Sequence, residues 1–138
     1  MERIKVLLVD DHAVVRLGLM TLLEDISWVE IVGEAGTAEE AISAVADLRP
    51  DVVLLDIRLP DDSGIVACST ITERWPQTKV IMLTSYADDN LIREAKLAGA
   101  CFYIPKVVGN QALIDALERM NEGELDLDPT VTQEIITL

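Results

Sequence analysis

Short apolar runs alternate with helical patterns along most of the chain. Five runs are continuously or nearly continuously apolar, as expected for strands that helices cover on both faces of a sheet. They span Ile4–Val9, Val29–Ala35, Val52–Asp56, Lys79–Thr84 and Cys101–Pro105. The segments between and after them predict helices over Ala13–Asp25, between Thr37 and Pro50, over Gly64–Arg74 and Asp89–Ala98, and between Asn110 and Gly123.

The ends of these helices carry recognisable signals. Thr37 and Glu40 have the spacing of a capping box, and Ser63 is a preferred residue for capping the third helix. Gly99 follows the fourth helix as a C-terminal cap, and Asn110 is the expected N-cap of the fifth. These signals predict where the helices begin and end.

Five strand–helix repeats predict a parallel sheet with right-handed crossovers and helices on both faces. The run Val29–Ala35 is the most polar, which suits an edge strand. Pro105 cannot donate a backbone hydrogen bond, so the fifth strand also belongs at an edge. We therefore expect an α/β, three-layer, doubly wound (βα)5 fold of the flavodoxin-like class, with strand order 2-1-3-4-5.

The last segment has a different composition. Residues 124–138 contain four acidic residues and no Lys or Arg, which indicates a solvated linker. Within it, Pro129–Leu138 is expected to add a short helix. Residues 1–123 are predicted to form one compact domain, since 138 residues leave no room for a second domain of ordinary size.

Composition narrows the functional classes. Eleven basic residues against 25 acidic ones give a net charge of -14, so this chain alone should not bind nucleic acid. No apolar run approaches the length of a membrane span, and no signal peptide precedes the first strand, which predicts a cytoplasmic protein. Cys68 and Cys101 lack metal-ligand spacing and are interpreted as buried thiols.

Polar residues that suit chemistry stand where strands end. Asp10 and Asp11 follow the first strand, Asp56 closes the third, Thr84 closes the fourth, and Lys106 follows the fifth. In a parallel sheet these ends share one edge, and the first and third strands flank the point where such sheets bind ligands. Three converging carboxylates would repel one another unless a cation neutralised them. Their hard oxygen atoms favour Mg²⁺ or Mn²⁺.

A carboxylate nucleophile, a cation and an ammonium group together indicate phosphoryl transfer. Asp56 can attack phosphorus, Lys106 can neutralise charge on the phosphoryl oxygens, and the Thr84 hydroxyl can donate a hydrogen bond to one of them. The simpler interpretation is that Asp10 and Asp11 cap a helix and that Lys106 lies on the surface. Five such residues at one edge of the sheet argue against that interpretation.

Four motifs, in order and spacing, resemble the receiver domain of bacterial two-component response regulators. They are Val9–His12, Leu55–Gly64, Leu83–Ser85 and Gly99–Lys106, and the resemblance covers about residues 4–122. The segment Asp11–Leu19 further resembles the NarL/LuxR-type subfamily, in which a helix-turn-helix domain follows the receiver. Residues 124–138 would then lead to an output domain that this chain does not include.

The resemblance implies a set of roles. Asp56 would accept the phosphoryl group, and Mg²⁺ would be held by Asp11, Asp56 and the Arg58 carbonyl, with Asp10 acting largely through water. Thr84 and Tyr103 match the family's switch pair. A sensor histidine kinase would be the donor, a phosphorylation-linked homodimer is expected, and DNA would be bound only through the output domain. The chain would not be an enzyme beyond its own phosphorylation and dephosphorylation.

Some positions depart from the family pattern. Phe102 stands where the subfamily usually has Gly, which predicts altered packing beside Tyr103. Ser63 replaces a common Asp. His12, beside the acidic pair, is interpreted as a loop or helix-start residue, since phosphoryl donation would come from the kinase.

Two alternatives stay open. A haloacid-dehalogenase-type phosphatase also uses a strand-end Asp and Mg²⁺, but it needs a second Asp two residues later, where this chain has Arg58. A stand-alone receiver that acts by protein–protein interaction would have the same site. The sequence downstream of this chain would separate the stand-alone receiver from the transcription factor.

Overall fold

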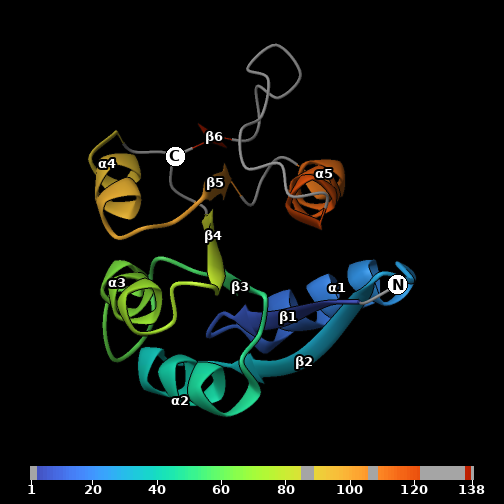
Figure 1. Ribbon diagram of the computed structural model, residues 1–138, viewed down its shortest axis with the longest axis horizontal. Helices are drawn as coiled ribbons and strands as arrows, with labels where there is room; N and C mark the ends of the chain where they lie inside the picture. The colour runs from blue at the N-terminus through green and yellow to red at the C-terminus, as the bar shows by residue number, and fades with distance from the viewer. Residues whose placement is uncertain (1–2, 85–88, 106–108, 122–135, 138) are drawn as a thin grey trace.

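A computed structural model describes residues 3–84, 89–105, 109–121 and 136–137. Its sheet has six strands in the order β2-β1-β3-β4-β5-β6, the first five of them parallel (Figure 1). The strands are β1 Ile4–Val9, β2 Val29–Ala35, β3 Val52–Leu55, β4 Lys79–Thr84, β5 Phe102–Pro105 and β6 Ile136–Thr137. The predicted 2-1-3-4-5 order of the parallel strands is confirmed.

Helices cover both faces of the sheet. They are α1 Ala13–Glu24, α2 Ala38–Leu48, α3 Gly64–Arg74, α4 Asp89–Leu97 and α5 Gly109–Asn121. Helices α2, α3 and α4 lie on one side of the sheet, and α1 and α5 lie on the other (Figure 1). The result is the three-layer, doubly wound arrangement expected from the sequence. No helix within the described ranges is long and apolar enough to cross a membrane.

Each strand contributes to two cores because successive side chains point to opposite faces. In β1, Leu7 and Val9 pack under α2 and α3, while Val6 and Leu8 pack on the α1 and α5 side. All four residues of β3 are buried, which explains why that run is continuously apolar. Phe102, which stands where the NarL/LuxR-type subfamily usually has Gly, is fully buried on the α1 and α5 side.

The helix caps follow the sequence closely. Thr37 Oγ1 accepts a hydrogen bond from Glu40 N at 3.0 Å, and the Glu40 carboxylate accepts one from Gly36 N at 2.8 Å. Ser63 Oγ accepts from Ile65 N at 3.1 Å and caps α3. Gly99 has φ +95°, and a Cβ there would lie 2.7 Å from Thr72 Oγ1. Glycine is therefore required after α4 for both conformation and space.

Three expectations about the last part of the chain need correction. Helix α5 begins at Gly109, so Asn110 lies in its first turn and is not the N-cap. Ile136 and Thr137 form strand β6, antiparallel to β5, where a helix was expected. Both residues are β-branched and suit a strand, and the outer edge of β5 offers backbone groups to pair with.

The third correction concerns the fifth strand, which was expected at an edge because of Pro105. Strand β5 lies inside the sheet, because β6 pairs with its outer side. Pro105 is compatible with that position because β6 pairs only with Phe102 and Tyr103. The linker predicted over residues 124–138 otherwise falls outside the described residues, and the domain boundary at residue 123 stays a prediction.

Candidate functional site

The register of the sheet brings the predicted acidic residues together. Val9 pairs with Leu55, so Asp10 and Asp56 follow a pair of neighbouring residues on β1 and β3. A backbone hydrogen bond from Asp56 N to Val9 O, 3.0 Å long, holds the two strand ends side by side. The carboxylates therefore meet at the carboxyl edge of the sheet, at the point where the strand order reverses.

Four side chains form one compact cluster at this edge. Ligand atoms of Asp10, Asp11, His12 and Asp56 all lie within 4.8 Å of one another. Asp10 is 2% exposed and Asp56 7% exposed, whereas Asp11 and His12 lie at the surface. Buried carboxylates at this separation are unfavourable without compensating positive charge. Three carboxylates fit a hard divalent cation such as Mg²⁺ or Mn²⁺.

Hydrogen bonds orient Asp10 from the start of α1. Its Oδ1 accepts from His12 N at 2.9 Å, and its backbone carbonyl accepts from the Arg16 guanidinium. Arg16 also donates from Nε to Glu34 Oε1 at 3.0 Å and so links α1 to β2. The first turn of α1 thus places Asp10 with its carboxylate turned into the cluster.

The ring of His12 contributes to the same cluster. Its Nδ1 lies 2.9 Å from Asp11 Oδ1 and 3.1 Å from Asp10 Oδ1. His12 occupies the N-cap position of α1, as expected, but its side chain makes no capping hydrogen bond. The sequence analysis did not predict that the His12 ring turns towards the acidic pair. The only sequence signal for this orientation was that His12 directly follows Asp11.

The loop after β3 fixes the backbone of Asp56. Gly64 N donates to Ile57 O at 2.6 Å, and Arg58 pairs with Ser63 in an antiparallel bridge. A Cβ on Gly64 would lie 2.0 Å from the Asp56 carbonyl oxygen, which no side chain tolerates. Gly64 therefore permits the close turn that holds Asp56 at the strand end.

Asp61 ties that loop to a second helix. Its two carboxylate oxygens accept hydrogen bonds from Ala38 N at 2.8 Å and Glu39 N at 3.0 Å. These donors, Ala38 N first, lower the pKa of the Asp61 carboxyl below its usual value, because they stabilise the charged form. Sequence reasoning missed this contact, since the partners are 22 and 23 residues apart.

The other predicted site residues are only partly described. Tyr103 is fully buried in the core under α2, α3 and α4. Thr84 ends β4, where its backbone pairs with Pro105, but its side chain lies outside the described part of the structure. Lys106 also lies outside the described residues. The structure thus brings Asp10, Asp11 and Asp56 together, with Arg58 in the adjoining loop.

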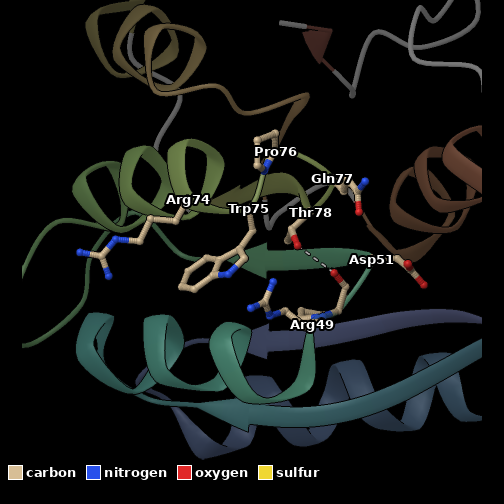
Figure 2. A pocket seen from close by; sticks show the side chains of 8 residues that line it. Arg49, Asp51, Arg74, Trp75, Pro76, Gln77 and Thr78 are labelled. Carbon is tan, nitrogen blue, oxygen red and sulfur yellow. Dashed lines mark hydrogen bonds between the residues drawn. The ribbon is translucent and has the colours of Figure 1, made fainter.

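A separate pocket of about 390 Å³ lies where β3 and β4 begin, at the opposite edge of the sheet. Trp75 and Arg49 line it, and the Arg49 guanidinium lies 5.5 Å from the centre of the indole ring it faces (Figure 2). Thr78 Oγ1 donates to Pro50 O at 3.0 Å (Figure 2). These contacts join the α2–β3 and α3–β4 loops, far from the acidic cluster.

Fold and site together define a doubly wound α/β domain with an acidic, cation-compatible site at its switch point. The family model of the response regulator receiver domain matches residues 6–118. The chain therefore belongs to the response regulator receiver domain family, and its relatives and structural neighbours support the NarL/LuxR type.

Among curated proteins, the chain is 43% identical over 125 residues to the DNA-binding transcriptional activator DevR/DosR of Mycobacterium tuberculosis. It is 39% identical over 128 residues to the response regulator protein VraR of Staphylococcus aureus. These matches cover 91% and 93% of this chain but only 58% and 61% of those proteins. The chain thus spans about three fifths of the length of these relatives.

Solved structures agree with the fold. A two-component response regulator of the LuxR family from Aurantimonas sp. SI85-9A1 superposes with a TM-score of 0.86 at 30% identity, covering 96% of this chain and 95% of that one. The isolated receiver domain of RcsB from Salmonella enterica serovar Typhimurium, determined with the phosphomimetic BeF3-, gives 0.83 at 25% identity, covering 89% and 91%.

Proposed function

We propose that this chain is a phosphorylation-dependent signalling switch that accepts a phosphoryl group on Asp56 from a sensor histidine kinase, with Mg²⁺ as cofactor. One observation carries the proposal. Asp56, a residue only 7% exposed, lies at a strand end with its carboxylate beside those of Asp10 and Asp11 in a domain of the receiver family.

The chemistry follows from these positions. An Asp56 carboxylate oxygen attacks phosphorus, the bond from phosphorus to the donor's leaving group breaks, and the phosphoryl group stays on Asp56. Asp11, Asp56 and the Arg58 carbonyl would hold Mg²⁺, with Asp10 acting largely through water. The bound cation would neutralise charge on the phosphoryl oxygens. Lys106 and Thr84 are the proposed further donors to those oxygens.

The output is proposed from the relatives. DevR/DosR is described as a DNA-binding transcriptional activator, and a further RcsB structure contains two dimers bound to two parallel DNAs. We infer that this receiver controls a C-terminal helix-turn-helix domain, that phosphorylation favours a homodimer, and that DNA is bound only through the added domain. Such a protein would act in the cytoplasm.

We propose that Thr84 and Tyr103 couple phosphorylation of Asp56 to a change in the packing beneath α4. A phosphoryl group on Asp56 would recruit the Thr84 hydroxyl and bias the packing of Tyr103 beneath α4. Hydrogen exchange with and without beryllofluoride should then change around residues 84–106 in wild type. Thr84→Ala should bind the mimic but transmit little. Changes confined to the Asp56 loop in wild type would rule out this coupling.

Two alternatives predict different behaviour. A phosphatase of the haloacid-dehalogenase type would turn over p-nitrophenyl phosphate steadily, whereas we propose that this chain catalyses only its own phosphorylation and dephosphorylation. Arg58 occupies the position where such a phosphatase has its second Asp. A stand-alone receiver would label on Asp56 in the same way, and the downstream reading frame would encode no helix-turn-helix domain.

The central test is labelling with acetyl phosphate and Mg²⁺, followed by intact-mass measurement. Wild type should gain one phosphoryl group, and the adduct should disappear without Mg²⁺. Asp56→Asn keeps nearly the same shape but removes the nucleophile, so it should not label. Asp47→Asn, an exposed position on α2, serves as the matched control and should label like wild type. Equal labelling of Asp56→Asn would refute the proposal.

A further inference from the structure

The His12 ring is placed in a way that helix capping does not explain. The residue occupies the N-cap position of α1 with extended backbone angles, φ −98° and ψ 112°, yet its side chain accepts no hydrogen bond from the helix. The ring instead faces Asp10 and Asp11, with 67% of the His12 side chain exposed. It is the single histidine of the chain.

The ring nitrogen lies among the carboxylates of the acidic cluster. Its Nδ1 atom shares a hydrogen bond with Asp10 Oδ1 at 3.1 Å and lies 2.9 Å from Asp11 Oδ1. The ligand atoms of His12, Asp10, Asp11 and Asp56 all lie within 4.8 Å of one another. A cation held by Asp11 and Asp56 would therefore be within reach of the ring nitrogen, which could bind the cation in place of the shared proton.

We propose that His12 Nδ1 is an additional ligand of the cation at the Asp10–Asp11–Asp56 cluster, and that it favours transition-metal ions such as Mn²⁺ over Mg²⁺. The inference rests on the proposed function, because it assigns a further residue to the same cation site. It predicts metal preference, which the carboxylates by themselves leave open.

The preference follows from ligand chemistry. Mg²⁺ binds carboxylate, carbonyl and water oxygens and keeps several waters, so a water takes the place of the ring when Mg²⁺ is bound. Divalent transition ions accept imidazole readily, and their affinity for nitrogen ligands rises from Mn²⁺ towards Cu²⁺. Because the ring is exposed at the mouth of the cluster, it can rotate away from one ion and coordinate another.

Pulsed electron paramagnetic resonance of bound Mn²⁺ tests the contact directly. Modulation from a coordinated imidazole nitrogen should appear with the whole chain, and its source is unambiguous because there is only one histidine. The modulation should vanish in His12→Ser, in which serine, a preferred N-cap residue, keeps α1 intact. Bound Mn²⁺ without nitrogen modulation in wild type would overturn the proposal.

Calorimetric titrations give a second readout. Mn²⁺ affinity should fall about tenfold in His12→Ser, at the lower end of what groups around a metal contribute. Mg²⁺ affinity should stay within about threefold, and Glu24→Gln, at the far end of α1, should change neither. Equal losses for both ions would refute the selectivity. Phosphoryl labelling of Asp56 decides the proposed function separately, since Mg²⁺-dependent labelling does not require His12.

Discussion

Replacing Gly64 with alanine should disturb both stability and phosphoryl transfer. The added Cβ would lie 2.0 Å from the Asp56 carbonyl oxygen, about 1.4 Å short of ordinary contact at 3.4 Å. Neither the backbone of Asp56 nor that of Gly64 can move away easily. Strand β3 is buried along its whole length, and Gly64 N is held by a 2.6 Å hydrogen bond to Ile57 O.

The expected cost lies at the upper end of overpacking substitutions, about 3 kcal/mol in the free energy of unfolding. A displacement of about 1 Å at a reacting group lowers a rate about 100-fold, so acetyl phosphate should label Gly64→Ala far more slowly. Urea unfolding and the time course of mass labelling measure the two effects. Labelling must be compared in the fraction of protein that is folded.

Gly18→Ala is the matched control. Gly18 lies on the exposed side of α1, and a Cβ there meets nothing within 4 Å. Alanine is a better helix former, so this variant should be about 0.5–1 kcal/mol more stable than wild type and label normally. A free energy of unfolding for Gly64→Ala within about 0.5 kcal/mol of wild type would show that the backbone around Asp56 can move to accept the added Cβ.

Three further outcomes are expected. Mg²⁺ should raise the melting temperature of wild type, and much less that of Asp11→Ala. At ~10 times its dissociation constant, Mg²⁺ should add about 1.4 kcal/mol to the unfolding free energy of wild type. Equal increases in the two proteins would show that Asp11 is not part of the site. Burial raises the pKa of Cys68 to about 12 and also raises that of Cys101, so a thiol reagent should label the folded protein slowly at about pH 8 and rapidly in urea. Prompt labelling of folded Cys68 would contradict its burial. The pKa of Asp61 is lower in the folded state, so its contribution to stability is complete above the unfolded-state pKa and is lost as the pH falls through the folded-state pKa. The difference in unfolding free energy between wild type and Asp61→Ala should therefore shrink from about pH 7 towards about pH 3. A difference that stays constant would contradict the stabilising contact of Asp61 with the start of α2.

Much of the fold was predictable because buried parallel strands leave a strong mark on a sequence. The four-residue run of β3 is wholly apolar and wholly buried, and the repeating strand–helix pattern predicted a parallel sheet. The order of the parallel strands was predicted from the edge character of β2 and β5, although β6 then covers the edge of β5. The meeting of Asp10 and Asp56 was predictable for a related reason. Residues at the ends of neighbouring parallel strands share one edge, whatever their separation in sequence.

Other features left no periodic signal. The Asp61 contact with α2 depends on how one loop lies against a helix 22 to 23 residues away. The direction of the His12 ring depends on a side-chain rotamer. Strand β6 has only two residues, too few for alternation to be detected. Such contacts depend on the path of the backbone in three dimensions, which hydrophobic patterning does not encode.

The pairing of β6 with β5 has a consequence for laboratory handling of the domain. A chain shortened before residue 136 would leave the outer backbone groups of Phe102 and Tyr103 open, and open strand edges are templates for pairing with other molecules. Self-association of such a truncated protein through the open edge would mimic the phosphorylation-linked dimer proposed above. Gel-filtration profiles of shortened and longer versions should therefore be compared before either is taken as the regulated state.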